Sequence, residues 1–107
     1  MSIPDLKGLL ETAQRIQSEV ARIRDELGRK TVEGETGGGL CRCTVSGRGE
    51  VLSLTIDPSI AGDKKMIEDL AVGAINIALT RARELAEADL SQATGGLPLP
   101  PGLLGAG

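Results

Sequence analysis

The chain has 107 residues, of which 40% are hydrophobic and 25% charged, as is typical of one soluble globular domain. It contains no histidine and no aromatic residue, which excludes an imidazole base, a histidine metal ligand and an aromatic stacking platform for single-stranded nucleic acid. The formal net charge is −3, and only residues 1–30 are slightly positive, with six Lys/Arg against five Asp/Glu. No signal peptide or membrane-spanning run is recognisable, so we expect a cytoplasmic protein.

A long helix is predicted over residues 4–28, ended by Gly28 as a C-cap. Its apolar residues are spaced alternately by three and four positions, the heptad pattern of a helix that packs along another helix. Such a helix is about 37 Å long, whereas a compact domain of this size has a radius of gyration of about 13 Å. We therefore expect it to project from the domain or to lie along a second subunit. The heptad seam consists of Leu6, Leu9, Ala13, Ile16, Val20, Ile23 and Leu27.

Alternation with a period of two predicts strands between residues 30 and 57. The turn GRGE at 47–50 joins two of them, and a shorter strand over about 30–34 precedes them. The result is a three-stranded antiparallel meander, whose buried face is expected to pack on a helix. The residues that share a face are Cys41, Cys43 and Val45 in the first of the two joined strands, and Leu52, Leu54 and Ile56 in the second.

A second long helix follows the strands. Asp57-Pro58-Ser59 breaks the last strand, and Asp63 is predicted to cap a helix whose apolar positions follow the i, i+3, i+4, i+7 pattern up to about Thr94. The order helix, three strands, helix predicts an α+β fold. We predict one domain over residues 1–94 and a Pro/Gly-rich irregular or disordered tail over residues 95–107.

Three consecutive glycines at 37–39 are the first candidate for a binding motif. A P-loop needs Gly-Lys-Ser/Thr and then a helix after its glycines, and a dinucleotide fingerprint also needs a following helix. Here Leu-Cys-Arg-Cys follows, on a predicted strand. We interpret the glycines as turn residues that permit positive φ; the alternative is a flexible loop that touches a ligand.

Cys41 and Cys43 are the second candidate. Two positions apart on one strand face, they are badly placed for a disulfide, and no further cysteine or histidine completes a metal site. We interpret them as small buried hydrophobic residues of a reduced protein. The carboxylates accompany no base or nucleophile arrangement, so we predict no enzyme, no cofactor, no metal and no small-molecule substrate.

The basic residues of the first helix permit two interpretations. Arg15, Arg22 and Arg29 are seven residues apart, so they line one stripe and could form a row of phosphate contacts. Carboxylates three or four residues away favour a solvated face with weak ion pairs instead. The heptad seam is equally open, because it can pack on the chain's own sheet and second helix or against another subunit.

Four segments of the chain form a recognisable series. They are AQRIQSEVARIRDEL, VEGETGGGLCRCTVSGRGEVLSLTIDPSI, EDLAVGAINIAL and LPPGL. Taken together, they resemble the YbaB/EbfC nucleoid-associated protein family over nearly the whole chain, because they occur in the family's order and spacing and Asn76 stands at the family's characteristic Asn. The departures are Cys41 and Cys43, where valines are usual, and an added Gly/Leu tail.

The resemblance implies a small homodimer with tweezer-like projecting helices that binds double-stranded DNA and influences nucleoid organisation or gene expression. An acidic protein can bind DNA if a dimer gathers its basic residues on one concave surface, and the contacts expected are to phosphates rather than to bases. The alternative is a protein–protein adaptor with no direct DNA binding. The candidate DNA-binding residues are Arg15, Arg22, Arg24, Arg29 and Lys30 on the first helix and Arg81 and Arg83 on the second.

Overall fold

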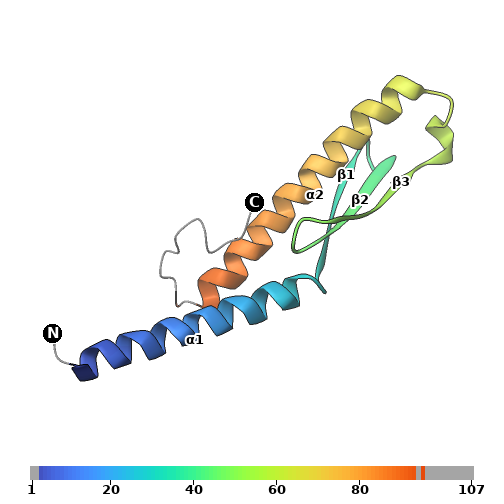
Figure 1. Cartoon of the computed structure of the whole chain (residues 1–107). Coiled ribbons are helices and arrows are strands. Elements are labelled where there is room, and N and C mark those ends of the chain that lie inside the picture. Colours follow the sequence, from blue (N-terminus) through green and yellow to red (C-terminus); the bar gives the residue numbers. More distant parts are fainter. Residues whose placement is uncertain (1–2, 94, 96–107) are drawn as a thin grey trace.

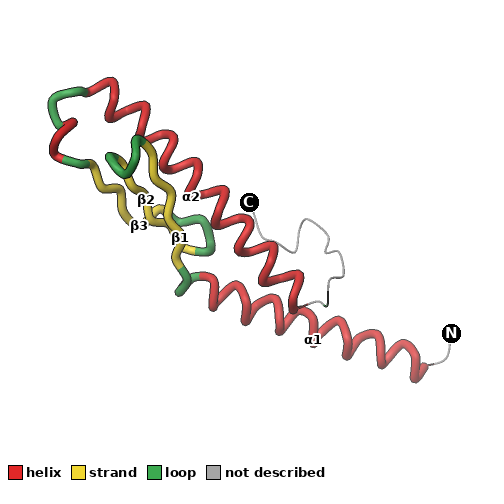
Figure 2. The backbone as a smooth tube through the Cα atoms, turned by 180° about the vertical axis from the view of Figure 1, so that it is seen from behind, coloured by secondary structure: helices red, strands yellow, loops and turns green. Residues whose placement is uncertain are grey.

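The chain folds into two long helices and a small antiparallel sheet (Figure 1, Figure 2). The computed structural model describes residues 3–93 and 95. The predicted α+β order of helix, three strands and helix is confirmed, whereas the predicted tail lies outside the described residues apart from Gly95. The elements are α1 (Ile3–Leu27), β1 (Thr31–Thr36), β2 (Cys41–Ser46), β3 (Val51–Ile56), the 3₁₀ helix η1 (Pro58–Ile60) and α2 (Lys64–Ala93).

The molecule is elongated because α1 projects from it. The principal extents are 71 × 20 × 19 Å and the radius of gyration is 19.2 Å, well above the roughly 13 Å of a compact domain of this size. The C-terminal end of α2 meets α1 near its middle, and the N-terminal half of α1 extends beyond that contact (Figure 1). The predicted projection of the first helix is thus confirmed.

The main core lies between α2 and the middle strand, β2. Alanines recur every fourth residue on the buried face of α2, and β2 supplies small side chains opposite them, so helix and sheet can pack closely. Burial raises the pKa of the Cys43 thiol above its ordinary value, and both cysteines are free, which confirms their predicted role as buried hydrophobic residues. The core residues are Cys41, Cys43, Val45, Ala74, Ala78 and Ala82.

Gly34 marks the closest approach of β1 to α2. An added Cβ at this position would lie 2.5 Å from the carbonyl oxygen of Ala74 and 2.5 Å from the backbone nitrogen of Ala78. Both are backbone atoms of a helix, which cannot move aside as a flexible side chain can. The glycine is therefore required by packing, and Arg81 of α2 reinforces the contact by donating to the carbonyl oxygen of Glu33 at 2.7 Å.

The three consecutive glycines form the turn between β1 and β2. Their φ angles are 65°, 69° and 97° for Gly37, Gly38 and Gly39, in the left-handed region that side chains other than glycine rarely adopt. The strands on either side pair antiparallel, with Thr36 opposite Cys41. The interpretation of this segment as a turn is confirmed.

A second, smaller core joins α1 to the C-terminal part of α2. Val20, Ile23 and Leu27 of α1 are buried there together with Leu90 of α2. These three residues form the C-terminal half of the predicted heptad seam, so that half packs within the chain, as one of the two interpretations held. The N-terminal half of the seam is exposed.

The hairpin between β2 and β3 clamps the C-terminal end of α1. The N–H of Gly47 donates to the carbonyl oxygen of Leu27 at 3.0 Å, and Nε of Arg48 donates to the carbonyl oxygen of Arg24 at 2.8 Å. Both acceptors lie in the last turn of the helix, where carbonyl groups accept from residues beyond the helix rather than from a continuing helical turn. These bonds determine how α1 leaves the sheet.

The expectation that the Leu52, Leu54 and Ile56 face would be buried under a helix is wrong for two of the three residues. Ile56 is half-buried, but Leu52 and Leu54 are 56% and 40% exposed. A helix with its side chains is about 10 Å wide, which spans two strands spaced about 4.8 Å apart, and α2 lies over β1 and β2. In addition, the register shifts between Thr44 and Val45, which interrupts the alternation at Leu52.

Replacing Gly34 with alanine should lower the free energy of unfolding by about 3 kcal/mol, because its Cβ would overlap the backbone of α2. Gly62→Ala is the matched control, since an added Cβ at that residue meets nothing within 4 Å; it should change stability by less than about 1 kcal/mol. Urea unfolding at one fixed protein concentration measures both. Equal stability of the two variants would contradict the close helix–strand contact.

Candidate nucleic-acid interface

Three of the seven predicted DNA-binding residues lie on the exposed surface of α1, and two more, Arg29 and Lys30, follow directly after its end at Leu27. A spacing of seven residues returns a side chain to nearly the same side of a helix, with a drift of about 20°, so Arg15 and Arg22 follow one stripe. Arg29 was predicted to continue this stripe, but it lies two residues beyond the end of α1. All three are exposed. The two interpretations of this stripe, phosphate contacts or ion pairs within the helix, can be compared residue by residue.

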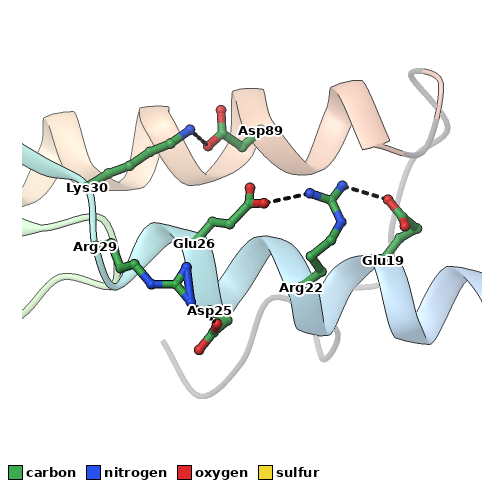
Figure 3. A network of polar contacts seen from close by, with 7 residues as sticks. All are labelled: Glu19, Arg22, Asp25, Glu26, Arg29, Lys30 and Asp89. Carbon is green, nitrogen blue, oxygen red and sulfur yellow. Dashed lines mark hydrogen bonds and ion pairs between the residues drawn. The ribbon is translucent and has the colours of Figure 1, made fainter.

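Arg22 is held by two carboxylates of its own helix (Figure 3). One guanidinium nitrogen lies 2.7 Å from Oε2 of Glu19 and the other lies 2.7 Å from Oε1 of Glu26. The hydrogen bond from Arg22 lowers the pKa of Glu19 and so favours the charged form of that carboxyl group. Arg22 is therefore less available to a phosphate than an unpaired arginine, although its side chain is 53% exposed.

Arg29 and Lys30, at the base of α1, are also paired with carboxylates (Figure 3). Arg29 donates to Asp25, and Asp25 also lies 3.7 Å from Arg48. Lys30 donates to Asp89 of α2 at 2.7 Å and thereby links the two helices. Asp89 is the better buried partner, with its side chain 19% exposed against 46% for that of Lys30.

Arg15 and Arg24 differ from these three residues. Both are exposed, and neither takes part in an ion pair within the part of the chain that the structure describes. Arg24 contributes its carbonyl oxygen to the clamp described above, which leaves its guanidinium group free to meet a ligand. Lys7, farther along the same helix, is likewise exposed and was absent from the predicted set. Its position in the exposed N-terminal half of α1 is the signal that could have identified it.

The two predicted arginines of α2 lie in different surroundings. Arg81 supports β1 by donating to the carbonyl oxygen of Glu33, and it lines a shallow depression of α2 with Thr80 and Glu84. Arg83 donates to the hydroxyl oxygen of Thr80 at 3.1 Å. Arg22 and Lys30, by contrast, line a separate depression between α1 and α2. The structure thus divides the predicted site residues between two surfaces of one chain.

Two further properties of the described residues bear on function. Within residues 3–93 and 95, no cluster of three or more cysteine or acidic side chains is arranged to hold a metal ion. Over the same residues, neither helix has a stretch apolar and long enough to cross a membrane.

Comparisons with known proteins place this fold and sequence in one family. The family model described as the YbaB/EbfC DNA-binding family matches residues 1–97. A nucleoid-associated protein of Bordetella avium (strain 197N) is 44% identical over 99 residues, which cover 92% of this chain and 92% of that protein. A nucleoid-associated protein of Chlorobium phaeobacteroides (strain BS1) is 38% identical over 97 residues, covering 91% and 87% of the two chains.

A solved structure shares the fold. The crystal structure of an uncharacterized protein from Helicobacter pylori superimposes with a TM-score of 0.71 at 24% identity, covering 90% of this chain and 99% of that one. The likeness to this structure concerns the fold alone. Together with the match of the family model to residues 1–97 and the two similar sequences, the observations lead to one conclusion: the chain belongs to the YbaB/EbfC DNA-binding family.

Proposed function

We propose that this protein binds double-stranded DNA as a homodimer, mainly through phosphate contacts, and acts in the cytoplasm as a nucleoid-associated protein that influences nucleoid organisation or gene expression. The observation that carries the proposal is the presence, on a projecting helix, of exposed arginines that have no ion-pair partner among the described residues, in a chain of a DNA-binding family. A guanidinium group presents a fork of donors that matches a phosphate, and an extended arm can place such groups along a duplex.

The contacts we propose are ordered by the cost of making them. Arg15 and Arg24 can meet a phosphate without breaking an ion pair of the chain. Arg22, Arg29 and Lys30 must each exchange a carboxylate for a phosphate, so they contribute less to affinity. Arg81 and Arg83 are candidates only where the duplex also reaches α2. The net charge of −3 does not oppose this proposal, because the electrostatic potential near the arm depends on the charges nearby rather than on the total.

The second copy in the proposed homodimer is placed on the open face beside β3. Leu54 lies opposite buried Cys43 in the sheet register, so it points to the side of the sheet that α2 only partly covers. Val51 and Leu52 of β3 are also exposed. β3 is moreover an edge strand, whose unpaired backbone groups invite pairing with another chain. A second copy would bury this apolar surface and add to a core that contains no aromatic residue.

Replacing Arg15 and Arg24 with alanine should weaken duplex binding roughly tenfold or more at low salt. It should also reduce the slope of the logarithm of affinity against the logarithm of salt concentration. The expected reduction is about 1.8 for each arm on the DNA, which is about 0.9 per lost phosphate contact. A fluorescence-anisotropy titration at several salt concentrations measures both quantities.

Lys64→Ala/Lys65→Ala is the matched control for this test. It removes the same charge from the N-terminal end of α2, far from α1 (Figure 1), and should leave the slope nearly unchanged. An equal loss in both double variants would assign the effect to total charge. If the unmodified protein binds no duplex even at low salt, the adaptor function takes the place of DNA binding.

Glu19→Gln with Glu26→Gln should strengthen duplex binding several-fold, because the change releases Arg22 from both of its carboxylates. The salt slope should steepen by about 0.9 per arm as one more phosphate is neutralised. The control is Glu68→Gln with Asp69→Asn, which changes the net charge equally. It releases Lys64 and Lys65 at the N-terminal end of α2, away from α1. The same titration measures all variants, and an equal gain in the control would show that Arg22 has no particular role.

Leu54→Glu should shift the protein from about twice its chain mass of 11.1 kDa toward a single chain, because a carboxylate would then have to be buried at the proposed dimer contact. Thr55→Glu is the control, since Thr55 lies opposite exposed Arg42 on the other face of the sheet. Sedimentation equilibrium measures the particle mass of both variants, and Thr55→Glu should keep the mass of the unmodified protein. A dimer that persists with Glu at position 54 would place the contact elsewhere.

A further inference from the structure

The hairpin between β2 and β3 brings a further arginine to the base of the α1 arm. Arg48 lies in the turn of this hairpin, and its side chain is 45% exposed. An added Cβ on Gly28 would lie 3.1 Å from Cζ of Arg48, so the guanidinium group lies directly on the C-terminal end of α1. The sheet thus contributes a cation to a surface that otherwise belongs to the helix.

Arg48 is held by one of its three side-chain nitrogens, and the other two are available to a ligand. Nε donates to the carbonyl oxygen of Arg24 at 2.8 Å. Neither terminal nitrogen makes a hydrogen bond within the described residues, because the carboxylate that approaches one of them, on Asp25, is 3.7 Å away and a bond of this kind is about 2.7–2.9 Å long. The bond from Nε restricts the side chain in advance, so a ligand that binds the terminal nitrogens has less conformational entropy to remove.

Two more arginines lie beside Arg48. Arg24 and Gly28 are four residues apart, and this spacing places them on the same side of the helix, where the Arg48 guanidinium group lies. Arg29 follows the end of α1 and donates to Asp25 (Figure 3), the same carboxylate that approaches Arg48. The three arginines therefore converge on one place, which we call the arm-base site.

Positive charge exceeds negative charge at the arm-base site. Asp25 is the carboxylate that pairs with its arginines, and the C-terminal end of a helix adds a partial charge of about −0.5. Glu50, the carboxylate of the hairpin itself, forms no ion pair within the described part of the chain and is exposed. Three guanidinium groups outweigh these negative charges together, so the site attracts an anion.

We propose that the arm-base site, made of Arg24, Arg29 and Arg48, binds a phosphate of the DNA backbone, and that Arg48 is a contact residue supplied by the hairpin. The inference rests on the proposed function and extends the interface from α1 to the sheet. The terminal nitrogens of Arg48 and the guanidinium group of Arg24 are the donors that need no exchange of partners. A guanidinium fork can donate to two phosphate oxygens at once.

The position of the site at the base of the arm favours it as an anchor. The N–H of Gly47, next to Arg48, donates to the carbonyl oxygens of Leu27 and Lys30 at 3.0 and 2.9 Å, so hairpin and helix end are joined at this point. A change in the angle of α1 moves the far end of the arm most and its base least. A phosphate bound here keeps its position relative to the sheet when the arm tilts.

Arg48→Ala should weaken duplex binding several-fold. It should also reduce the slope of the logarithm of affinity against the logarithm of salt concentration by about 0.9 per arm, because one phosphate contact is lost. Arg42→Ala is the matched control, since it removes an arginine of similar exposure, 50% against 45%, from the opposite end of β2. It should leave the slope unchanged. Fluorescence-anisotropy titration at several salt concentrations measures both variants.

Two further variants separate a phosphate contact from an effect on the angle of α1. Arg48→Lys loses the planar fork but keeps a cation that can bind a phosphate, so it should retain the salt slope. Asp25→Asn removes the shared carboxylate and leaves the bond from Arg48 to the backbone of Arg24 in place, so it should strengthen binding several-fold. Glu35→Gln is its control, because it releases Arg42 in the same way and should not strengthen binding.

Three outcomes would overturn the inference. If the unmodified protein binds a duplex and Arg48→Ala keeps its salt slope, the proposed function stands and the arm-base site fails alone. An equal loss of slope in Arg48→Lys and Arg48→Ala would make Arg48 a residue that only positions α1, and an equal loss in Arg42→Ala would assign the effect to total charge. An unmodified protein that binds no duplex would overturn the inference and the proposed function together.

Discussion

The close contact between α2 and the β1–β2 pair is the interaction on which the rest of the structure depends. A row of alanines on α2 faces small residues of β2, and at Gly34 the backbones of strand and helix nearly touch. Because no aromatic side chain is available to fill a wider gap, the core gains its burial through close approach rather than through bulk. Because of this geometry, α2 lies over β1 and β2 and leaves much of β3 exposed.

The order and type of the elements were predictable because their patterns are local. The heptad spacing in α1, the alternation in β2 and the aspartate that caps α2 through the N–H of Met66 each depend on neighbours within a few residues. The exposure of Leu54 was not predictable in this way, since it depends on how many strands one helix can cover. Gly34 was likewise inconspicuous, because its role is set by a helix that lies forty residues farther along the chain.

The candidate site likewise combines local contacts, which the sequence predicts, with long-range contacts, which it does not. The pairing of Arg22 with Glu19 and Glu26 follows from helical spacing, and it was one of the two interpretations of the sequence. The pairing of Lys30 with Asp89 joins residues 59 positions apart, and no local pattern announces it. What separates Arg15 and Arg24 from Arg22, Arg29 and Lys30 is the lack of a carboxylate partner among the described residues, a property that becomes visible only when the surroundings of each cation are known.

The hairpin clamp on α1 has a mechanical consequence. From the clamped carbonyl of Leu27 to the first leucine of the arm is about 32 Å, so a tilt of about 10° at the base moves the tip by roughly 5–6 Å. That displacement exceeds the rise of about 3.4 Å between successive nucleotides of one DNA strand. An added Cβ on Gly47 would lie 2.6 Å from the carbonyl oxygen of Leu27. The close contact at Gly47 therefore sets the angle at which α1 leaves the domain, and a small change at this one residue moves the far end of the helix by more than one nucleotide step.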